Sequence, residues 1–294
     1  MRWLASVRLT PQRGVGNDRS RHVTHNDVLS LERDSPERVN VLGVGVSAIT
    51  VADALARIDA WIASGANRYV CVTGVHGVME SQRDPALRDI HNRAGLVVPD
   101  GMPLVWLSWL SGHRYVERVY GPDLMLACCA ASVSRGYRHY FYGGAAGVPE
   151  RLATRLQERF AGLKVAGTWS PPFRELSAAE EQAVIDRITL AKPDIVWVGL
   201  STPKQERWMA RYVGRLPVPV LIGVGAAFDL HAGLKKQAPR WMQPIGLEWL
   251  FRLTTEPRRL WRRYLINNPW FVWRLLLQLS GTVRHDLDLN TRKG

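Results

Sequence analysis

The chain has 294 residues, of which 46% are hydrophobic and 22% charged, a composition typical of globular proteins that argues against wholesale disorder. Its 39 Lys and Arg outnumber its 26 Asp and Glu, and the net charge of +13 favours acidic partners such as nucleic acid, anionic lipid or phosphorylated substrates. Three cysteines, two of them adjacent, indicate neither a disulfide framework nor a zinc site and fit a reducing cytoplasm. No apolar run reaches the length of about eighteen residues that predicts a transmembrane helix.

The chain divides into three parts by composition. Residues 1–38 are polar and arginine-rich without an apolar stretch, which predicts a flexible, disordered leader rather than a secretory signal. Residues 39–239 alternate apolar runs with helical patterns and form the predicted core. Residues 240–294 form a basic, tryptophan-rich appendage.

The core pattern predicts an α/β fold. A strand or hairpin is expected at 39–46, followed by strands at 69–73, 96–98, 139–142, 163–166, 194–200 and 218–224. Helices are expected at 78–92, 123–133, 149–159, 178–190 and 204–212. Strands that alternate with helices at this spacing imply right-handed crossovers and a mostly parallel sheet.

Polar residues that follow the strands are the first candidates for binding, because ligands of open α/β sheets lie outside the carboxyl ends of the strands. The candidates are Thr73-Gly74, Asp100-Gly101, Gly143-Gly144, the segment 201–206 and the segment 225–229. Asp100 is read equally well as a turn aspartate. The pair Gly143-Gly144 lacks the GxGxxG pattern, so a plain turn is the stronger interpretation. His76 has no partner at metal spacing and is interpreted as a satisfied loop histidine.

The appendage combines positive charge with aromatic residues. Between Arg240 and Arg274 it holds seven arginines and two glutamates, a net charge of +5, together with five of the twelve tryptophans of the chain. This composition is typical of an interfacial helix that docks on an anionic membrane surface. Pro269 is expected to kink or end the helix. A core-packing or dimer-forming helix is the alternative, so a homo-oligomer stays open.

Six motifs in fixed order make the chain resemble the WecG/TagA/CpsF family of glycosyltransferases (glycosyltransferase family 26). They are SQRDPALRDIHNRAGLVVPDGMPLVW, ERVYGPDLM, FYGGAAGVPERL, PDIVWVGLSTPKQERW, GVGAAFDLHAG and APRWMQPIGLEWLFRLTTEPRRLWRR. The resemblance runs from about residue 41 to residue 262. The resemblance implies a Rossmann-like core of the GT-E type with a helical C-terminal appendage. It also implies an inverting, UDP-sugar-dependent transferase for cell-surface or exopolysaccharide biosynthesis, peripheral on the cytoplasmic face of the membrane.

The donor and acceptor follow from the same resemblance. The donor is expected to be of the UDP-N-acetylmannosamine type, with UDP-glucose as the alternative, and the acceptor an undecaprenyl-pyrophosphate-linked sugar. A non-catalytic UDP-sugar-binding subunit of a polysaccharide assembly complex is the alternative of another class. A nucleic-acid-binding protein is disfavoured because no reading motif such as an RRM or helix-turn-helix appears.

The resemblance also assigns roles to residues. Asp100 matches the proposed catalytic base, the carboxylate that takes the proton of the acceptor hydroxyl. Thr73 matches a pocket threonine suited to hydrogen-bond donor or acceptor hydroxyls. Arg118 and Gln205 match pocket residues that we assign to sugar and phosphate groups, and Asp229 matches a position suited to the uracil imide. Gly143, Gly144 and Gln205 are assigned to the nucleotide.

Two departures from the family pattern bear on specificity. The family often has an aromatic pair where this chain reads Gly167-Thr168-Trp169-Ser170-Pro171-Pro172-Phe173, so base stacking falls to Phe173 or Trp169. The TGVHG loop has glycine where many members have asparagine, which bears on donor choice.

No metal and no other cofactor is expected. The Asp-x-Asp letters occur at 286–288, in the C-terminal tail, where a solvated acidic pair is the interpretation. The family resemblance likewise implies metal independence, so arginines must neutralise the departing UDP. Arg252, Arg259 and Arg262 match family arginines, and their spacing predicts that they share one helix face that closes over the site.

Overall fold

The protein is described by a computed structural model that covers residues 35–287. Most of the predicted leader (1–38) therefore lies outside the described residues, although Arg38 already belongs to the first strand. Asp288 of the tail also lies outside them.

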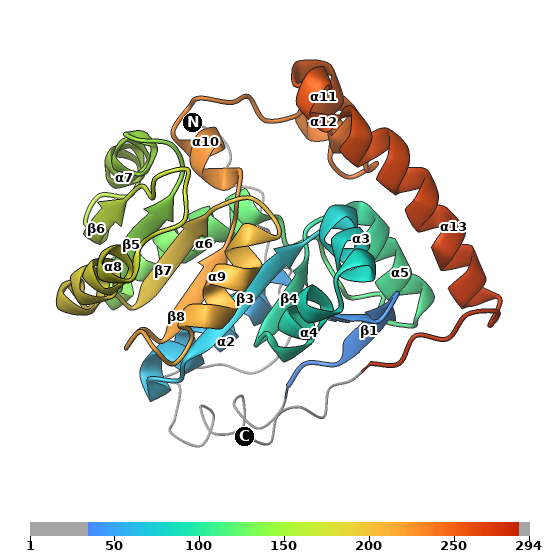
Figure 1. Cartoon of the computed structure of the whole chain (residues 1–294), viewed down its shortest axis with the longest axis horizontal. Coiled ribbons are helices and arrows are strands. Elements are labelled where there is room, and N and C mark those ends of the chain that lie inside the picture. The colour runs from blue at the N-terminus through green and yellow to red at the C-terminus, as the bar shows by residue number, and fades with distance from the viewer. Residues whose placement is uncertain (1–34, 288–294) are drawn as a thin grey trace, which may run out of the picture.

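The core is a six-stranded sheet in which every neighbouring pair is parallel, in the order β4-β3-β8-β7-β5-β6 (Figure 1). Its strands are β3 (Arg68–Thr73), β4 (Leu96–Pro99), β5 (Arg138–Gly143), β6 (Lys164–Trp169), β7 (Ile195–Gly199) and β8 (Val220–Gly223). All six had been predicted. When the strands are followed in chain order, the direction in which they are added across the sheet changes twice, as in a doubly wound fold. This arrangement confirms the predicted Rossmann-like α/β core.

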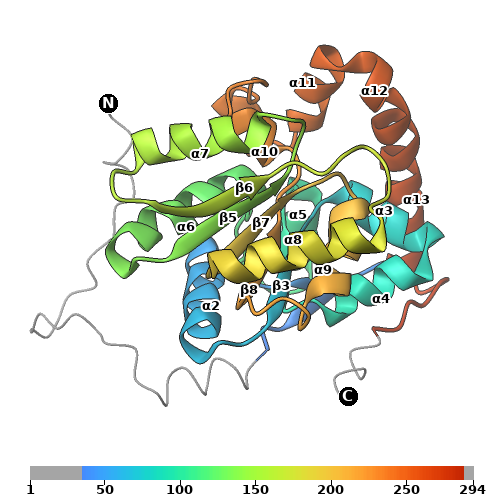
Figure 2. The ribbon, with the colours of Figure 1, turned by 60° about the vertical axis from the view of Figure 1, so that its left-hand side comes forward.

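The strands are apolar along their length because both faces of the sheet are covered. In β7, Ile195 and Trp197 pack into one hydrophobic cluster, and Val196 and Val198 pack into the other. This alternation is the period-two pattern of a strand. One cluster contains side chains from α3, α8 and α9, and the other contains side chains from α2, α6, α7 and α10. Figure 2 shows α8 lying across the nearer face.

The helices of the core begin and end at recognisable signals. They are α2 (Val51–Ser64), α3 (Val75–Arg83), α4 (Pro85–Arg93), α5 (Met102–Leu110), α6 (Gly121–Arg135), α7 (Val148–Arg159), α8 (Ala178–Ala191), α9 (Lys204–Tyr212) and α10 (Ala227–His231). The capping boxes Thr50–Asp53 and Ser177–Glu180 start α2 and α8. The predicted helices from 123 to 212 are confirmed.

The single helix expected at 78–92 is wrong, because Asp84 divides it into α3 and α4. Asp84 has extended backbone angles, and its side chain accepts a hydrogen bond from the Leu87 amide at 3.3 Å. Pro85 follows at the first position of α4, where a missing N–H does no harm. The helices α2 and α5 were not predicted. For α5, the apolar sequence MPLVWLSWL has little amphipathic pattern to reveal it.

The region 39–46 is a hairpin rather than one strand. β1 (Arg38–Val41) and β2 (Val44–Ser47) pair antiparallel through a turn at Leu42 and Gly43, both with positive φ. The hairpin packs beside β4, where the Val97 amide donates to Ser47 Oγ at 3.1 Å.

The appendage consists of short helices that lead into one longer helix. It contains a 3₁₀ turn η1 (Arg240–Met242), then α11 (Glu248–Thr255), α12 (Pro257–Trp261), a π-helical turn η2 (Arg262–Ile266) and α13 (Asn267–Leu279). Figure 1 shows α11 and α12 beyond the end of the sheet and α13 running down beside α3 and the hairpin. Pro269 does not end the helix, since it lies in the first turn of α13, where proline is tolerated.

Candidate functional site

The candidate site lies at the carboxyl edge of the sheet, where the polar residues that come directly after the parallel strands lie together. Along this edge Asp100 follows β4, Thr73 ends β3, and Gly143 and Gly199 end β5 and β7. The Asp100 amide donates to the Thr73 carbonyl at 3.0 Å, so these two residues are direct neighbours. The structure therefore brings together two of the predicted site residues.

Asp100 is half-buried and faces the start of α6. Its Oδ1 accepts a hydrogen bond from the Gly121 amide, at the N-terminus of α6, at 3.0 Å. Tyr120, the N-cap residue of α6, has no side-chain cap hydrogen bond, so Asp100 partners one of the free amides of that helix end. Burial raises the pKa of Asp100 above its usual 3.8, Arg118 opposes this shift, and Glu248 adds to it. A carboxylate with a raised pKa is a better proton acceptor. The local structure is thus suited to general-base chemistry.

Arg118 links Asp100 to the appendage. Its Nε donates to the Asp100 backbone carbonyl, and its Nη2 forms an ion pair with Glu248 Oε2 on α11 at 2.5 Å. Its guanidinium also stacks on the Tyr120 ring, 4.1 Å from the centroid. Both ionic partners are largely shielded, with side-chain exposures of 15% and 13%. Much of the donor capacity of Arg118 is therefore committed inside the protein.

Two further arginines of the appendage are half-buried and act electrostatically on the same place. Arg252 on α11 interacts with Asp100, Tyr120 and Glu248. Arg263 on η2 interacts with Asp100 and Arg252, and burial together with Arg252 lowers its pKa. The Nε of Arg263 is buried without a hydrogen-bond partner. Arg263 was not predicted as a site residue, because the family motif was matched to its neighbour Arg262. The sequence feature that could have indicated it is the adjacent arginine pair itself.

The prediction that Arg252, Arg259 and Arg262 share one helix face is wrong. The helix breaks at Glu256, whose φ of −133° and ψ of 57° separate α11 from α12. Arg259 is exposed and pairs with Glu256 at 2.6 Å, and Arg262 is exposed and stacks over Trp261 at 5.2 Å. Pro257 stops the helical periodicity that the spacing argument assumed.

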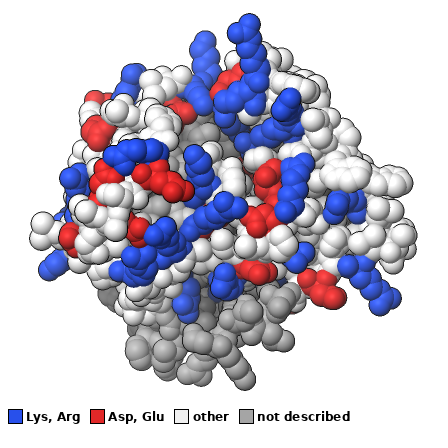
Figure 3. All heavy atoms as spheres, viewed as in Figure 1, with Lys and Arg blue, Asp and Glu red and all other residues white. Residues whose placement is uncertain are grey.

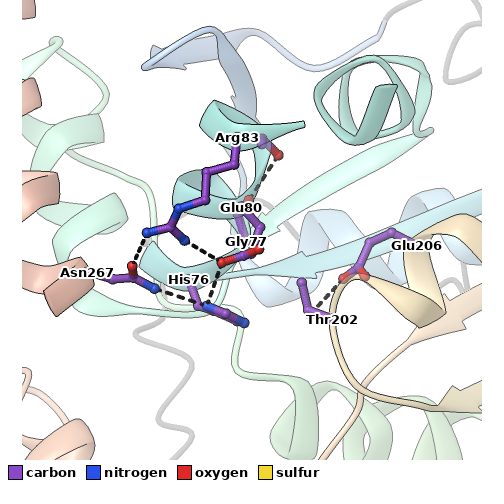
Figure 4. A network of polar contacts seen from close by, with 8 residues as sticks. His76, Gly77, Glu80, Arg83, Thr202, Glu206 and Asn267 are labelled. Atoms are coloured by element: carbon purple, nitrogen blue, oxygen red, sulfur yellow. Dashed lines mark hydrogen bonds and ion pairs between the residues drawn. The ribbon is translucent and has the colours of Figure 1, made fainter. Parts of the chain in front are cut away.

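A polar network holds the appendage to α3 (Figure 4). Arg83 Nη2 donates to Asn267 Oδ1 at 2.6 Å, and Asn267 Nδ2 lies 3.4 Å from His76 Nδ1. Burial, helped by Arg263, lowers the pKa of His76 to about 3, so the ring is neutral at physiological pH. His76 is thus satisfied by partners, as expected, although it lies in the first turn of α3 rather than in a loop.

The glycines at the ends of β5 and β7 allow a close backbone approach. A Cβ on Gly143 would lie 2.7 Å from the Gly199 backbone, and the φ of Gly143 is 122°. Gly144 has a φ of 75°, and its amide donates to the Gly199 carbonyl at 3.0 Å. The turn interpretation therefore accounts for this pair, and its predicted role toward the nucleotide stays a prediction.

The other residues assigned to the nucleotide lie apart from Asp100. Phe173 is 97% exposed in the segment after β6, whereas Trp169 is half-buried, with its ring 5.4 Å from that of Tyr142. Asp229 on α10 forms an ion pair with Lys235 at 2.9 Å, which in turn lies 3.4 Å from Glu256. An Asp229 that binds uracil would have to share its carboxylate with Lys235.

The appendage presents both cations and apolar side chains to its surroundings. Figure 3 shows Lys and Arg side chains gathered over α11 and α12 at the top of the molecule. Large apolar side chains are exposed as well: Trp261, Leu265, Ile266, Trp270, Val272, Trp273, Leu276 and Leu279. Within residues 35–287, no helix is long and apolar enough to cross a membrane. In the same residues no three His, Cys, Asp or Glu side chains gather as a metal site.

Comparison with known proteins shows the family to which the chain belongs. A family model described as Glycosyl transferase WecG/TagA/CpsF family matches residues 39–285. An N-acetylglucosaminyldiphosphoundecaprenol N-acetyl-beta-D-mannosaminyltransferase of Bacillus spizizenii is 32% identical over 197 residues, which cover 67% of this chain and 74% of the relative. The protein of the same name from Staphylococcus aureus is 26% identical over 246 residues, which cover 83% and 94%.

Proposed function

Since the chain belongs to the WecG/TagA/CpsF family of glycosyltransferases, we propose that it transfers N-acetylmannosamine, or a related hexose or N-acetylhexosamine, from its UDP donor to an undecaprenyl-pyrophosphate-linked sugar. The names of the relatives supply this substrate class. The transfer belongs to cell-surface or exopolysaccharide biosynthesis. The observation that carries the proposal is the position of Asp100, which lies at the carboxyl edge of the sheet with a raised pKa and a neighbouring arginine pair, Arg252 and Arg263.

The reaction follows from that position. The acceptor hydroxyl oxygen attacks the anomeric carbon of the donor sugar while Asp100 takes the hydroxyl proton. The bond between the anomeric carbon and the phosphate oxygen breaks, and its electron pair leaves with UDP. Attack from the side opposite to the leaving group inverts the anomeric configuration.

The departing diphosphate needs positive charge, which we assign to the arginines of the appendage. Arg252 and Arg263 interact electrostatically with Asp100, whereas Arg259 and Arg262 are exposed on the same segment. Guanidinium groups match phosphate oxygens bidentately. Arg263 is the strongest candidate because its buried Nε has no hydrogen-bond partner among residues 35–287. We expect the reaction to run without a metal ion.

The test is a UDP-release assay on the purified full chain in the presence of EDTA. UDP-N-acetylmannosamine and UDP-glucose are offered with short-chain lipid-pyrophosphate acceptors, beside a control that lacks acceptor. Acceptor-dependent release from one donor, lost in Asp100→Asn, supports the proposal and identifies the donor. Absence of release from every donor would instead support a UDP-sugar-binding subunit, and activity only after Mg²⁺ addition would refute metal independence.

The site must meet a lipid-linked acceptor, and we propose that α12 to α13 dock the protein peripherally on the cytoplasmic face of the membrane. The exposed apolar side chains of α13 and the cations Arg258, Arg259 and Arg262 support this docking. Each basic residue near an anionic surface contributes about 1 kcal/mol. We expect the protein to co-sediment with vesicles of anionic lipid and not with vesicles of neutral lipid. High salt should weaken the co-sedimentation with anionic vesicles. Trp270→Ser with Trp273→Ser should abolish it, and equal sedimentation of this variant would refute the docking surface.

A further inference from the structure

Gln205 and Glu206 are two adjacent polar side chains buried at the start of α9. They are 3% and 1% exposed. Thr202 Oγ1 donates to Glu206 Oε1 at 2.9 Å, the contact drawn in Figure 4, and Gln205 Nε2 donates to the same oxygen at 3.1 Å. Burial of polar groups is unfavourable unless their hydrogen bonds are made, so this arrangement calls for an explanation.

The carboxylate of Glu206 fixes which way the Gln205 amide points. A carboxylate oxygen accepts hydrogen bonds, and an amide can donate to it only through the NH₂ group. The carbonyl oxygen of the amide, Oε1, is then directed away and has no hydrogen-bond partner among residues 35–287. It lies 3.4 Å from the position that a Cβ on Gly225 would take. A buried acceptor without a partner costs free energy, which a hydrogen bond from a ligand would recover.

Sheet register places Thr73 and Gln205, which lies against Gly223 and Gly225, at the ends of two neighbouring strands. In the β3–β8 pair, Cys71 is opposite Gly223, the last residue of β8, and Thr73 and Gly225 each lie two residues further along the chain. Neighbouring strands are about 4.8 Å apart. Within residues 35–287, Thr73 Oγ1 and Glu206 Oε2 are also buried without a hydrogen-bond partner. Three unpaired polar atoms, Gln205 Oε1, Glu206 Oε2 and Thr73 Oγ1, therefore lie near the junction of β3 and β8.

This junction lies in the middle of the carboxyl edge. Asp100 is on one side, bonded to Thr73 through the backbone, and the Gly143-Gly144 turn is on the other side, beyond β7. If Asp100 takes the proton of the acceptor hydroxyl, the anomeric carbon of the donor sugar must lie within reach of that hydroxyl. The donor sugar then lies next to Asp100 and Thr73, at the junction. Sugar hydroxyls and an acetamido N–H are hydrogen-bond donors, whereas an ionised phosphate is not.

We propose that Glu206 is a positioning residue that sets the polarity of Gln205, so that Gln205 accepts a hydrogen bond from an O–H or N–H of the donor sugar. The inference rests on the proposed function and sharpens it. On this view Gln205 accepts a hydrogen bond from the sugar and does not donate one from its NH₂ group to the phosphates, to which it is also assigned from the sequence. Without the Glu206 carboxylate the Gln205 amide can turn, so the preference for a sugar that donates this hydrogen bond is lost.

The test is calorimetry, which measures how tightly the full chain binds UDP, UDP-N-acetylmannosamine and analogues of this sugar nucleotide. In the analogues each sugar hydroxyl is replaced in turn by fluorine, which cannot donate, and the acetamide is N-methylated. For the wild-type protein one analogue is expected to bind about 10- to 100-fold more weakly than the parent. In Glu206→Gln, whose new amide can donate to a turned Gln205, the same analogue should lose no more than about threefold relative to the parent. The affinity for UDP should be equal in both proteins.

Ser81→Ala is the control for loss of a buried polar group elsewhere in the core, because it removes a hydroxyl with two contacts, to the Gly77 carbonyl at 2.9 Å and to His91 at 3.2 Å. It should lower the melting temperature but keep the full penalty for the analogue. Gln205→Met should remove the penalty as Glu206→Gln does.

The inference is overturned if Glu206→Gln keeps the full penalty, if its UDP affinity falls as much as its sugar-nucleotide affinity, or if no analogue is penalised in the wild type. In these cases acceptor-dependent UDP release by the wild type would leave the proposed function standing. A wild-type protein that binds no UDP-sugar and releases no UDP would overturn both.

Discussion

The core and the appendage are held together by different kinds of interaction. The core strands lie between two apolar clusters, and Trp197 of β7 is wholly buried. In the appendage, α11 buries no residue completely, and α12 to α13 bury Leu260, Tyr264, Asn267 and Phe271. Polar contacts complete its attachment, including Arg118 with Glu248 and Arg83 with Asn267. The core is stable through burial, and the appendage is positioned by a few directed contacts.

The difference has a consequence at the place where the two regions meet. Asp100 from the core and Arg263 from the appendage are both charged groups that burial disfavours, since burial raises the pKa of Asp100 and lowers that of Arg263. Groups held at such a cost are typical of functional sites. Variants of these residues should therefore separate activity from stability, whereas variants of the clusters should not.

The largest effect is expected from Asp100→Asn. Loss of a general base lowers kcat by about 10²- to 10⁴-fold. The folded-state pKa of Asp100 lies above its unfolded value, so ionisation at neutral pH opposes folding, and removing the charge should leave the melting temperature unchanged or higher. Kinetics and thermal unfolding at pH 7 check both parts. A lower melting temperature together with the activity loss would mean that Asp100 is structural.

Arg263→Gln should lower kcat/KM by about 10²-fold through weaker stabilisation of the departing diphosphate. It removes a charge that burial disfavours, so stability should not fall. The matched control is Arg258→Gln, an exposed arginine of α12, which should keep turnover in detergent within about twofold. Equal losses in the two variants would mean that only the total positive charge of the appendage matters.

A cavity in the core should destabilise the whole protein, whereas a cavity in the appendage should destabilise the appendage alone. Trp197→Ala in the core should lower the free energy of unfolding by about 3–5 kcal/mol, with hydrogen exchange rising throughout the sheet. Phe271→Ala, at 3% exposure on α13, should raise exchange in α11 to α13 and lower activity while the sheet stays protected. Uniform loss of protection in Phe271→Ala would show that the two regions unfold as one unit.

The smallest expected effect is a shift of the pH profile. With Asp100 as base, kcat/KM falls as the pH drops through a pKa that burial and Glu248 hold above 3.8. Glu248→Gln removes the contribution of Glu248, so the acid limb should move to lower pH. The measurement is the pH dependence of kcat/KM in both proteins, and an unchanged limb would assign it to another group. Glu248 also pairs with Arg118, so an accompanying fall in kcat is expected.

The core strands were predictable because each is an apolar run bounded by turn residues, as in YVCVT and DIVWVGL. Asp100 and Thr73 could be found because they follow such runs and match family motifs. The joint action of Arg252 and Arg263 could not be found, because helical spacing says nothing about a break at Glu256 or about the turn at η2 that directs Arg263 inward.

The sequence by itself determined the α/β class, the strands and the polar residues at their ends, since these depend on local periodicity and on neighbours along the chain. Only the tertiary structure decided which arginines approach Asp100, that Arg118 is committed to Glu248, and that the Gln205 amide donates to Glu206. These features join segments far apart in sequence, and their geometry depends on how the appendage packs and which buried partner each polar group meets.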